Sequence, residues 1–113
     1  MALALQIFFN DPKRKTVYHP FSFQDVLLRS WWPLAQRLAL PLLQQLECLF
    51  IRDQEQAESL LRELEVVRNA LQDPENVGVS REDAAYMLLR ISEVEPLIRG
   101  ALKEWSCVDQ LSL

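Results

Sequence analysis

Apolar and polar residues alternate near the start of the chain, with the period of two that is typical of a β-strand. In the segment LALQIFF, the residues Leu3, Leu5, Ile7 and Phe9 share one face. Turn-forming residues follow in NDPK, and the β-branched and aromatic residues of RKTVYH come next. The pattern predicts a β-hairpin over residues 1–20. Because a lone hairpin is marginally stable in water, we expect it to pack on the helices or to find a partner strand.

The apolar positions take a helical spacing from Ser22 onward, and prolines divide residues 22–51 into short predicted helices. Ser22 is the predicted N-cap of the first of these helices. Pro33 disfavours the α conformation at Trp32, so this helix ends or kinks there and Pro33 can begin the next one. Pro41 opens a further predicted helix with the sequence PLLQQLECLFI.

Two long helices are predicted over residues 53–72 and 80–106. Asp53 begins a capping-box pattern at the first, and Ser80 is the predicted N-cap of the second. The loop DPENVGV joins them, so we expect the two helices to form an antiparallel hairpin. Apolar residues recur along them with a period near 3.6, namely Ala57, Leu60, Leu61, Leu64, Val67 and Leu71, then Ala84, Leu88, Ile91, Ile98, Leu102 and Trp105.

Together these elements predict a mainly α fold. It is a helical bundle built on the long antiparallel helix hairpin, with the N-terminal β-hairpin as a minor component. The chain has 113 residues and half of them are hydrophobic, which is enough for a single core without metal or disulfide support. We therefore expect one domain, 1–113.

Charge is distributed unevenly along the chain, whose formal net charge is −4. Residues 1–40 carry five Lys or Arg against two Asp or Glu, a balance of +3. Residues 41–113 carry seven against fourteen, a balance of −7. A polyanion would be repelled by this acidic part of the chain, whereas a basic partner would be attracted to it.

Residue types that support catalysis or metal binding are scarce. His19 is the single histidine, and the two cysteines, Cys48 and Cys107, are far apart in the sequence. No metal-ligand spacing and no nucleophile with its base are present, so we expect no metal, no cofactor and no enzymatic activity. Because neither a secretory signal after Met1 nor an apolar run of ~20 residues is found, we expect a cytoplasmic protein with reduced, buried thiols.

Glu95 is unusual among the carboxylates. It stands where the apolar stripe of the second long helix calls for a hydrophobic residue, immediately before Pro96, which should bend that helix. One interpretation is an ion pair with Arg99, one turn further on. The other is a carboxylate held at a groove, where it would suit an arginine from a partner.

Acidic side chains on the outward sides of the two long helices are the main candidate for a binding surface. They form either a merely solvated face or a docking face for a basic cleft, and the latter would accelerate association. Trp31 and Trp32 diverge by about 100° on a helix, so either both are structural or one ring is an exposed anchor. The candidate partner-binding residues are Glu55, Glu58, Glu65, Glu82, Asp83, Glu93, Glu95 and Trp32.

The pattern of residues in three segments is similar to that of a known class of proteins. The segments are WWPLAQRLALPLLQQLECLF, AESLLRELEVVRNAL and YMLLRISEVEPLIRGALKEW. In a small acidic helical protein without a catalytic set, they resemble bacterial immunity proteins of polymorphic or type VI secreted toxins. The resemblance covers Trp31 to Trp105. It implies a tight cytoplasmic complex with one cognate toxin whose active-site cleft is plugged. We expect the acidic helical face to cover a basic cleft, and we expect no membrane partner.

Two other classes of function stay open. One is a structural or adaptor module that self-associates through the apolar sides of its helices, with Trp31 or Trp32 at the interface of a homodimer. The other is a regulator that binds nucleic acid through the basic residues of PKRK, at Pro12 to Lys15. A solvated hairpin turn explains those charges as well, and we expect no nucleic-acid partner.

Overall fold

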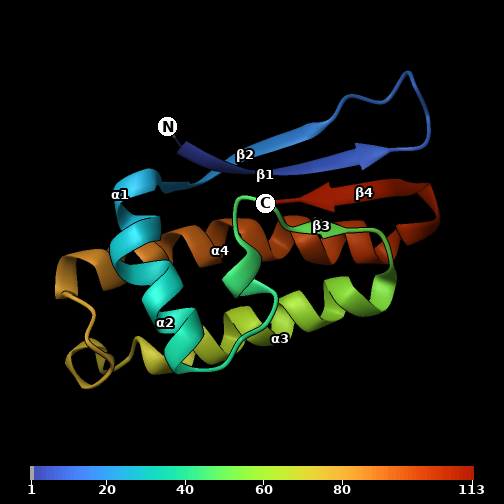
Figure 1. Cartoon of the computed structure of the whole chain (residues 1–113). Helices are drawn as coiled ribbons and strands as arrows, with labels where there is room; N and C mark the ends of the chain where they lie inside the picture. Colours follow the sequence, from blue (N-terminus) through green and yellow to red (C-terminus); the bar gives the residue numbers. More distant parts are fainter. Residues whose placement is uncertain (1) are drawn as a thin grey trace.

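The computed structural model describes residues 2–113 and contains a four-stranded antiparallel sheet with its helices on one side (Figure 1). The strands are β1 (Ala2–Phe9), β2 (Val17–Phe23), β3 (Phe50–Ile51) and β4 (Val108–Ser112). Their order across the sheet is β2-β1-β4-β3. The sheet therefore brings both ends of the chain and a short segment from its middle into one layer.

The first two strands form a hairpin where the alternation predicts one, although β2 continues to Phe23. Asp11 organises the turn between them. Its side chain accepts a hydrogen bond from the backbone of Lys13 at 2.9 Å, and its carbonyl accepts one from Arg14 at 3.0 Å. This is the turn chemistry expected of an aspartate placed before a proline.

The predicted helical bundle is wrong, because the hairpin is only half of a larger sheet and the fold is α+β. The C-terminal strand β4 pairs with β1, and β3 pairs with β4. The register of β1 and β4 shifts between Phe8 and Phe9, which interrupts simple alternation. A five-residue strand with an irregular register has little local signal, because its stability comes from pairing with a segment at the other end of the chain.

The helix predicted from Pro41 to Ile51 is also absent. Residues Leu43–Gln45 form a single 3₁₀ turn, and the chain then turns away at Glu47, whose φ is 82°. The buried carboxylate of Glu63 accepts hydrogen bonds from the backbone of Leu42 at 3.1 Å and of Leu43 at 2.9 Å. These contacts anchor the start of the turn to the long helix that carries Glu63.

Residues 24–37 form one helical run in place of two helices separated at Trp32. It consists of α1 (Gln24–Val26), a π-helical stretch (Leu27–Trp31) and α2 (Trp32–Arg37). The backbone N–H of Trp32 donates to the carbonyl of Leu27, five residues earlier. The wide π turn immediately before Pro33 accommodates the proline without ending the helix. The N-cap is Phe23, whose side chain has no atom that can accept a hydrogen bond. The predicted cap, Ser22, is instead buried in β2, and its hydroxyl donates to the carbonyl of Phe23.

The two long helices are present with their predicted caps. They are α3 (Gln54–Ala70) and α4 (Arg81–Lys103). Asp53 accepts from the backbone N–H of Gln56 at 2.8 Å, and Ser80 from that of Asp83 at 3.1 Å. The helix α4 continues through Pro96. Short 3₁₀ turns follow the helices, at Pro74–Val77 and at Trp105–Cys107. In Figure 1, α4 lies directly under the sheet and α3 packs beside it.

The hydrophobic core lies between the helices and the sheet face that they cover. Phe21 of β2 is fully buried, and its ring meets the ring of Trp31 with centroids 4.8 Å apart. Trp31 is 1% exposed and therefore belongs to the core. Trp32, proposed above as a binding anchor, is half-buried and packs against the same core.

Candidate protein interaction surface

The helices leave the second face of the sheet uncovered (Figure 1). An antiparallel sheet with one solvated face normally alternates apolar residues inside with polar residues outside. Here the outer positions that pair across the strands are uncharged, and several are aromatic. Arg52, directly after β3, brings a cation to this face by donating to Gln110 at 3.2 Å. The residues that strand pairing places on this face are Ala4, Gln6, Phe8, Tyr18, Pro20, Phe50, Gln110 and Ser112.

One row of residues crosses this face from edge to edge. Tyr18 pairs with Gln6, Gln6 with Ser112, and Ser112 with Phe50. Tyr18 and Phe50, at the two ends of the row, are 62% and 57% exposed. The side chains of Gln6 and Ser112 between them are shorter. The row therefore forms a hollow of about 400 Å³, which we call the trough. Its lining residues are Leu3, Ala4, Gln6, Tyr18, Glu47, Phe50, Ser112 and Leu113.

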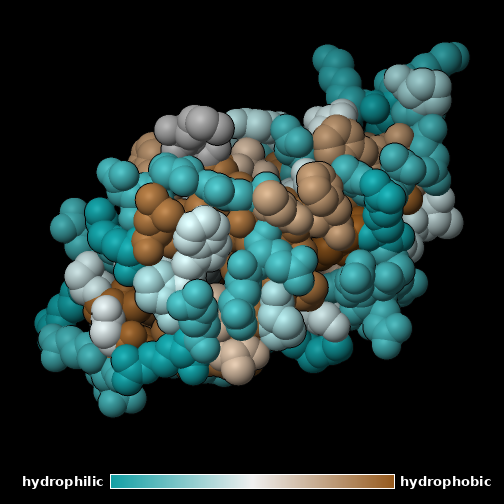
Figure 2. Space-filling model, in the orientation of Figure 1, coloured by the Kyte–Doolittle hydropathy of each residue, from teal (hydrophilic) through white to brown (hydrophobic). Residues whose placement is uncertain are grey.

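Phe50 is the large apolar side chain exposed at the trough, whereas Leu3 and Leu113 in its lining are buried and most of the other lining residues are polar. In Figure 2, brown and tan residues gather over the region of β3 and β4, whereas teal residues cover most of the surface over α3. The two exposed aromatic side chains of the trough, Tyr18 and Phe50, are not needed to build the core, because they are not part of it. Aromatic residues are enriched among the side chains by which proteins bind other proteins.

Glu47 contributes the only charge among the described residues that line the trough. Its backbone is in the left-handed region, with φ of 82°, which costs a non-glycine residue about 1 kcal/mol. The neighbouring Leu46 and Leu49 are buried and fix the chain on either side. The position of the carboxylate is therefore held by the fold at the cost of backbone strain, an arrangement found at functional sites.

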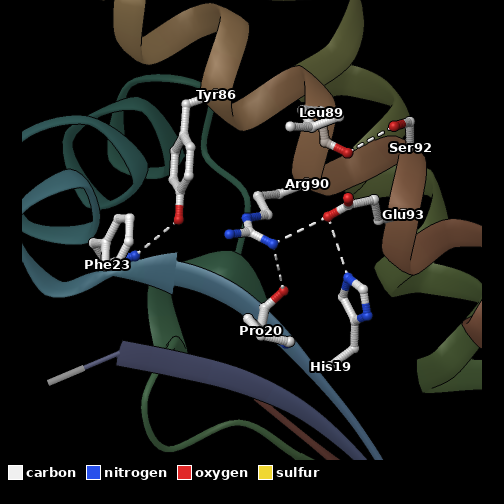
Figure 3. Close-up of polar contacts among 8 residues, drawn as sticks. All are labelled: His19, Pro20, Phe23, Tyr86, Leu89, Arg90, Ser92 and Glu93. Atoms are coloured by element: carbon white, nitrogen blue, oxygen red, sulfur yellow. Dashed lines mark hydrogen bonds and ion pairs between the residues drawn. The ribbon is translucent and has the colours of Figure 1, made fainter.

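The edge of the sheet next to the trough is closed by side chains from α4 (Figure 3). The hydroxyl of Tyr86 accepts a hydrogen bond from the backbone N–H of Phe23 at 3.1 Å, and the two rings stack. Arg90 donates to the carbonyl of Pro20 at 3.4 Å. Because proline has no N–H and these groups are already paired, β2 presents a poor edge for a further strand. The open face remains the more available surface.

Glu93 takes part in the same contacts and is not free for a partner. It accepts from His19 at 3.2 Å and from Arg90 at 3.1 Å (Figure 3). These hydrogen bonds, that of His19 first, lower the pKa of Glu93 below its usual value. The pairing links α4 to β2, which is a structural role.

Asp83 and Glu95, two more of the predicted binding residues, are buried. Asp83 accepts from Arg29 through both carboxylate oxygens at 2.8 Å and from Ser30 at 2.6 Å. These bonds, led by that of Arg29, lower the pKa of Asp83 despite burial. Glu95 pairs with Arg68 of α3 and not with Arg99, so it joins the two long helices.

The remaining acidic residues of the predicted helical face separate into two groups. Glu65 pairs with Arg68, which Glu95 also contacts. Glu55, Glu58 and Glu82 are exposed and form no ion pair within residues 2–113. Glu55 and Glu58 lie at the start of α3, and Glu82 lies at the start of the antiparallel α4, so the unpaired charges sit at opposite ends of the helix pair. The predicted acidic face is thus interrupted by the chain's own arginines.

The basic turn at Pro12 to Lys15 is also partly paired. Arg14 forms an ion pair with Glu104, which lowers the pKa of Glu104, and its guanidinium lies 3.7 Å from the centre of the Phe9 ring. These contacts tie the turn to the end of α4. All three basic residues of this turn are exposed, and among the described residues Lys13 and Lys15 form no ion pair.

Other features of the described residues add no candidate site. Cys48 and Cys107 are free and exposed, contrary to the expectation that they are buried. Within residues 2–113, no group of three potential ligands could hold a metal ion. No described helix has the length and apolar character to cross a membrane.

Comparison with known proteins gives no match, whether with family models, with curated proteins or with solved structures.

The sequence patterns did not predict the residues of the trough as a binding site, for two different reasons. Tyr18 has a usable signal, because it alternates with Val17 and His19 and so belongs to the opposite face of its strand. Phe50 and Glu47 have none, because both fall in a segment whose apolar spacing predicts a helix. Only strand pairing brings them beside Tyr18 and Gln6.

Proposed function

We propose that this chain is a cytoplasmic protein of the immunity type, which binds a basic toxin or effector protein and neutralises it. The observation that carries the proposal is the trough, a hollow with two exposed aromatic residues at its edges and one acidic residue, at a sheet face that the fold leaves open. Surfaces of this composition bind proteins through a few aromatic anchors.

Charge supports the same kind of partner. The formal net charge of −4 attracts a basic protein over a distance, although Arg14 and Arg29 of residues 1–40 pair with carboxylates of residues 41–113. Glu55 and Glu58 remain exposed near the start of α3. In this proposal the acidic charge accelerates the encounter, and the trough supplies the contacts that hold the complex.

The test begins with capture from the native host at moderate salt and identification of the partner, which is then purified. We expect a basic effector domain that forms a stoichiometric complex and loses its activity when bound. Replacing Glu58 by Lys should slow association several-fold at low salt and have less effect at high salt, because salt screens exposed charges. Arg62→Lys, one turn away on the same helix, keeps the charge and is the matched control.

Two results would overturn the proposed function. One is that the purified candidate keeps its full activity in the presence of saturating amounts of this protein. The other is that only copies of this chain associate, with a mass in sedimentation experiments that corresponds to a homodimer. The second result would favour the structural or adaptor class.

A further inference from the structure

We propose that the trough binds an arginine or lysine side chain of the protein partner, with Tyr18 and Phe50 as its walls and Glu47 as the counter-charge. The inference rests on the proposed function, because it names the group by which a basic partner would be recognised. It places recognition on the open sheet face and not on the helices.

The dimensions of the trough suit an inserted side chain. Three strand spacings separate Tyr18 from Phe50, which corresponds to about 14 Å between their backbones. Both rings stand at the edges of the row, and the side chains of Gln6 and Ser112 form the floor between them. A segment of a partner can lie between the rings and direct one side chain toward the floor.

The chemistry of the lining favours a cation. A guanidinium or ammonium group is attracted to the faces of aromatic rings and to a carboxylate, and both are present here. The amide oxygen of Gln6 and the hydroxyl of Ser112 can accept hydrogen bonds from the same group. Within residues 2–113, the side chains of Gln6, Tyr18 and Glu47 make no hydrogen bond or ion pair, so their polar atoms are available.

A second copy of the chain fits this surface less well. Two hollowed faces leave space between them when they are placed together, whereas stable interfaces are packed as densely as protein interiors. The arrangement would also bring two Glu47 carboxylates, each at its own trough, toward each other in a chain that already carries a net charge of −4. A basic side chain removes both problems, because it fills the hollow and neutralises the charge.

The experiment uses the full chain, a hexa-arginine peptide and the same peptide with citrulline in place of every arginine. Citrulline keeps the shape of arginine and removes its charge. Backbone amide signals followed by ¹⁵N NMR should shift saturably at Gln6, Glu47 and Phe50 with the arginine peptide, and should not shift with the citrulline peptide. Saturable shifts confined to the region of Glu58 on α3 would overturn the inference, as would the absence of any saturable shift.

Variants then test the individual groups. Glu47→Gln keeps the size and backbone of the residue, and we expect about threefold weaker binding of the arginine peptide. Tyr18→Leu should weaken it by a similar factor through loss of the ring face. Glu75→Gln removes an exposed carboxylate of the 3₁₀ turn at Pro74–Val77, outside the trough, and should leave the affinity of the trough unchanged. Equal affinity for the unchanged chain and for both trough variants would overturn the inference.

Failure of this inference can be told apart from failure of the proposed function. A partner protein that binds both trough variants as tightly as the unchanged chain would overturn the inference alone. Occupation of the trough by the arginine peptide, with no inhibited partner protein, would support the assigned ligand chemistry and overturn the proposed function. Amide shifts at the trough that depend on protein concentration alone would place a second copy there and overturn the inference.

Discussion

The two faces of the sheet differ in what they contribute. On the covered face, Leu5, Phe21 and Leu111 are fully buried against the helices. On the open face, Tyr18 and Phe50 lie at the two edges in solvent, with short side chains between them. The covered face follows from the need to build a core. The open face has an aromatic character that the core does not require, and this difference identifies it as the candidate binding surface.

The largest effect that this comparison predicts comes from the covered face. Phe21→Ala should lower the free energy of unfolding by about 3–5 kcal/mol, because it removes a buried ring and leaves a cavity beside Trp31. Urea denaturation followed by tryptophan fluorescence measures the change. Tyr18→Ala, in the same strand on the open face, is the matched control and should cost far less. Equal losses for the two variants would contradict the division between the faces.

A smaller effect is expected at Asp83, which the sequence assigned to a binding surface and the structure assigns to an internal ion pair. Asp83→Asn should lower the free energy of unfolding by about 2 kcal/mol, because it weakens the charge-assisted bonds with Arg29 and Ser30. Glu82→Gln, the adjacent exposed residue in the same helical turn, should change it by less than about 0.5 kcal/mol. If Glu82→Gln lowered the free energy of unfolding as much as Asp83→Asn does, or if Asp83→Asn left it unchanged, the result would contradict this assignment.

The stabilising contribution of Asp83 should depend on pH. Its pKa is lower in the folded chain than in the unfolded one, so the contribution is complete above the unfolded pKa of about 3.9. It is lost as the pH falls through the lower, folded pKa. The difference in stability between the unchanged chain and Asp83→Asn should therefore be constant from pH 7 to pH 5 and shrink below about pH 4. Denaturation at several pH values checks this.

The smallest effect is predicted for the open face. Phe50→Thr should change the free energy of unfolding by less than about 0.5 kcal/mol, because the ring is largely in solvent and threonine retains a preference for strands. The adjacent Ile51 faces the core and is fully buried, so Ile51→Ala should cost about 2–5 kcal/mol. Thermal or urea denaturation of both variants makes the comparison within a single strand. A large decrease in the free energy of unfolding for Phe50→Thr would mean that the open face contributes to the stability of the fold.

Local sequence patterns succeeded where local interactions decide the structure. The polar caps at Asp53 and Ser80 begin α3 and α4 as expected, because a side-chain oxygen that accepts a nearby backbone N–H acts within one turn. The hairpin between β1 and β2 follows from alternation and from the turn residues that separate its strands. The period of 3.6 likewise indicates which sides of α3 and α4 are buried.

The sequence by itself therefore determined the two long helices, the hairpin and the uneven charge, because each depends on neighbours a few residues apart. Only the tertiary structure decided that β3 and β4 extend the hairpin into a sheet, since their pairing joins distant segments. It also decided which carboxylates are free. Whether a glutamate faces water or an arginine depends on the element packed against it, as Glu95 and Arg68 show. For the same reason the trough has no motif in the sequence, because its walls come from strands that meet only after folding.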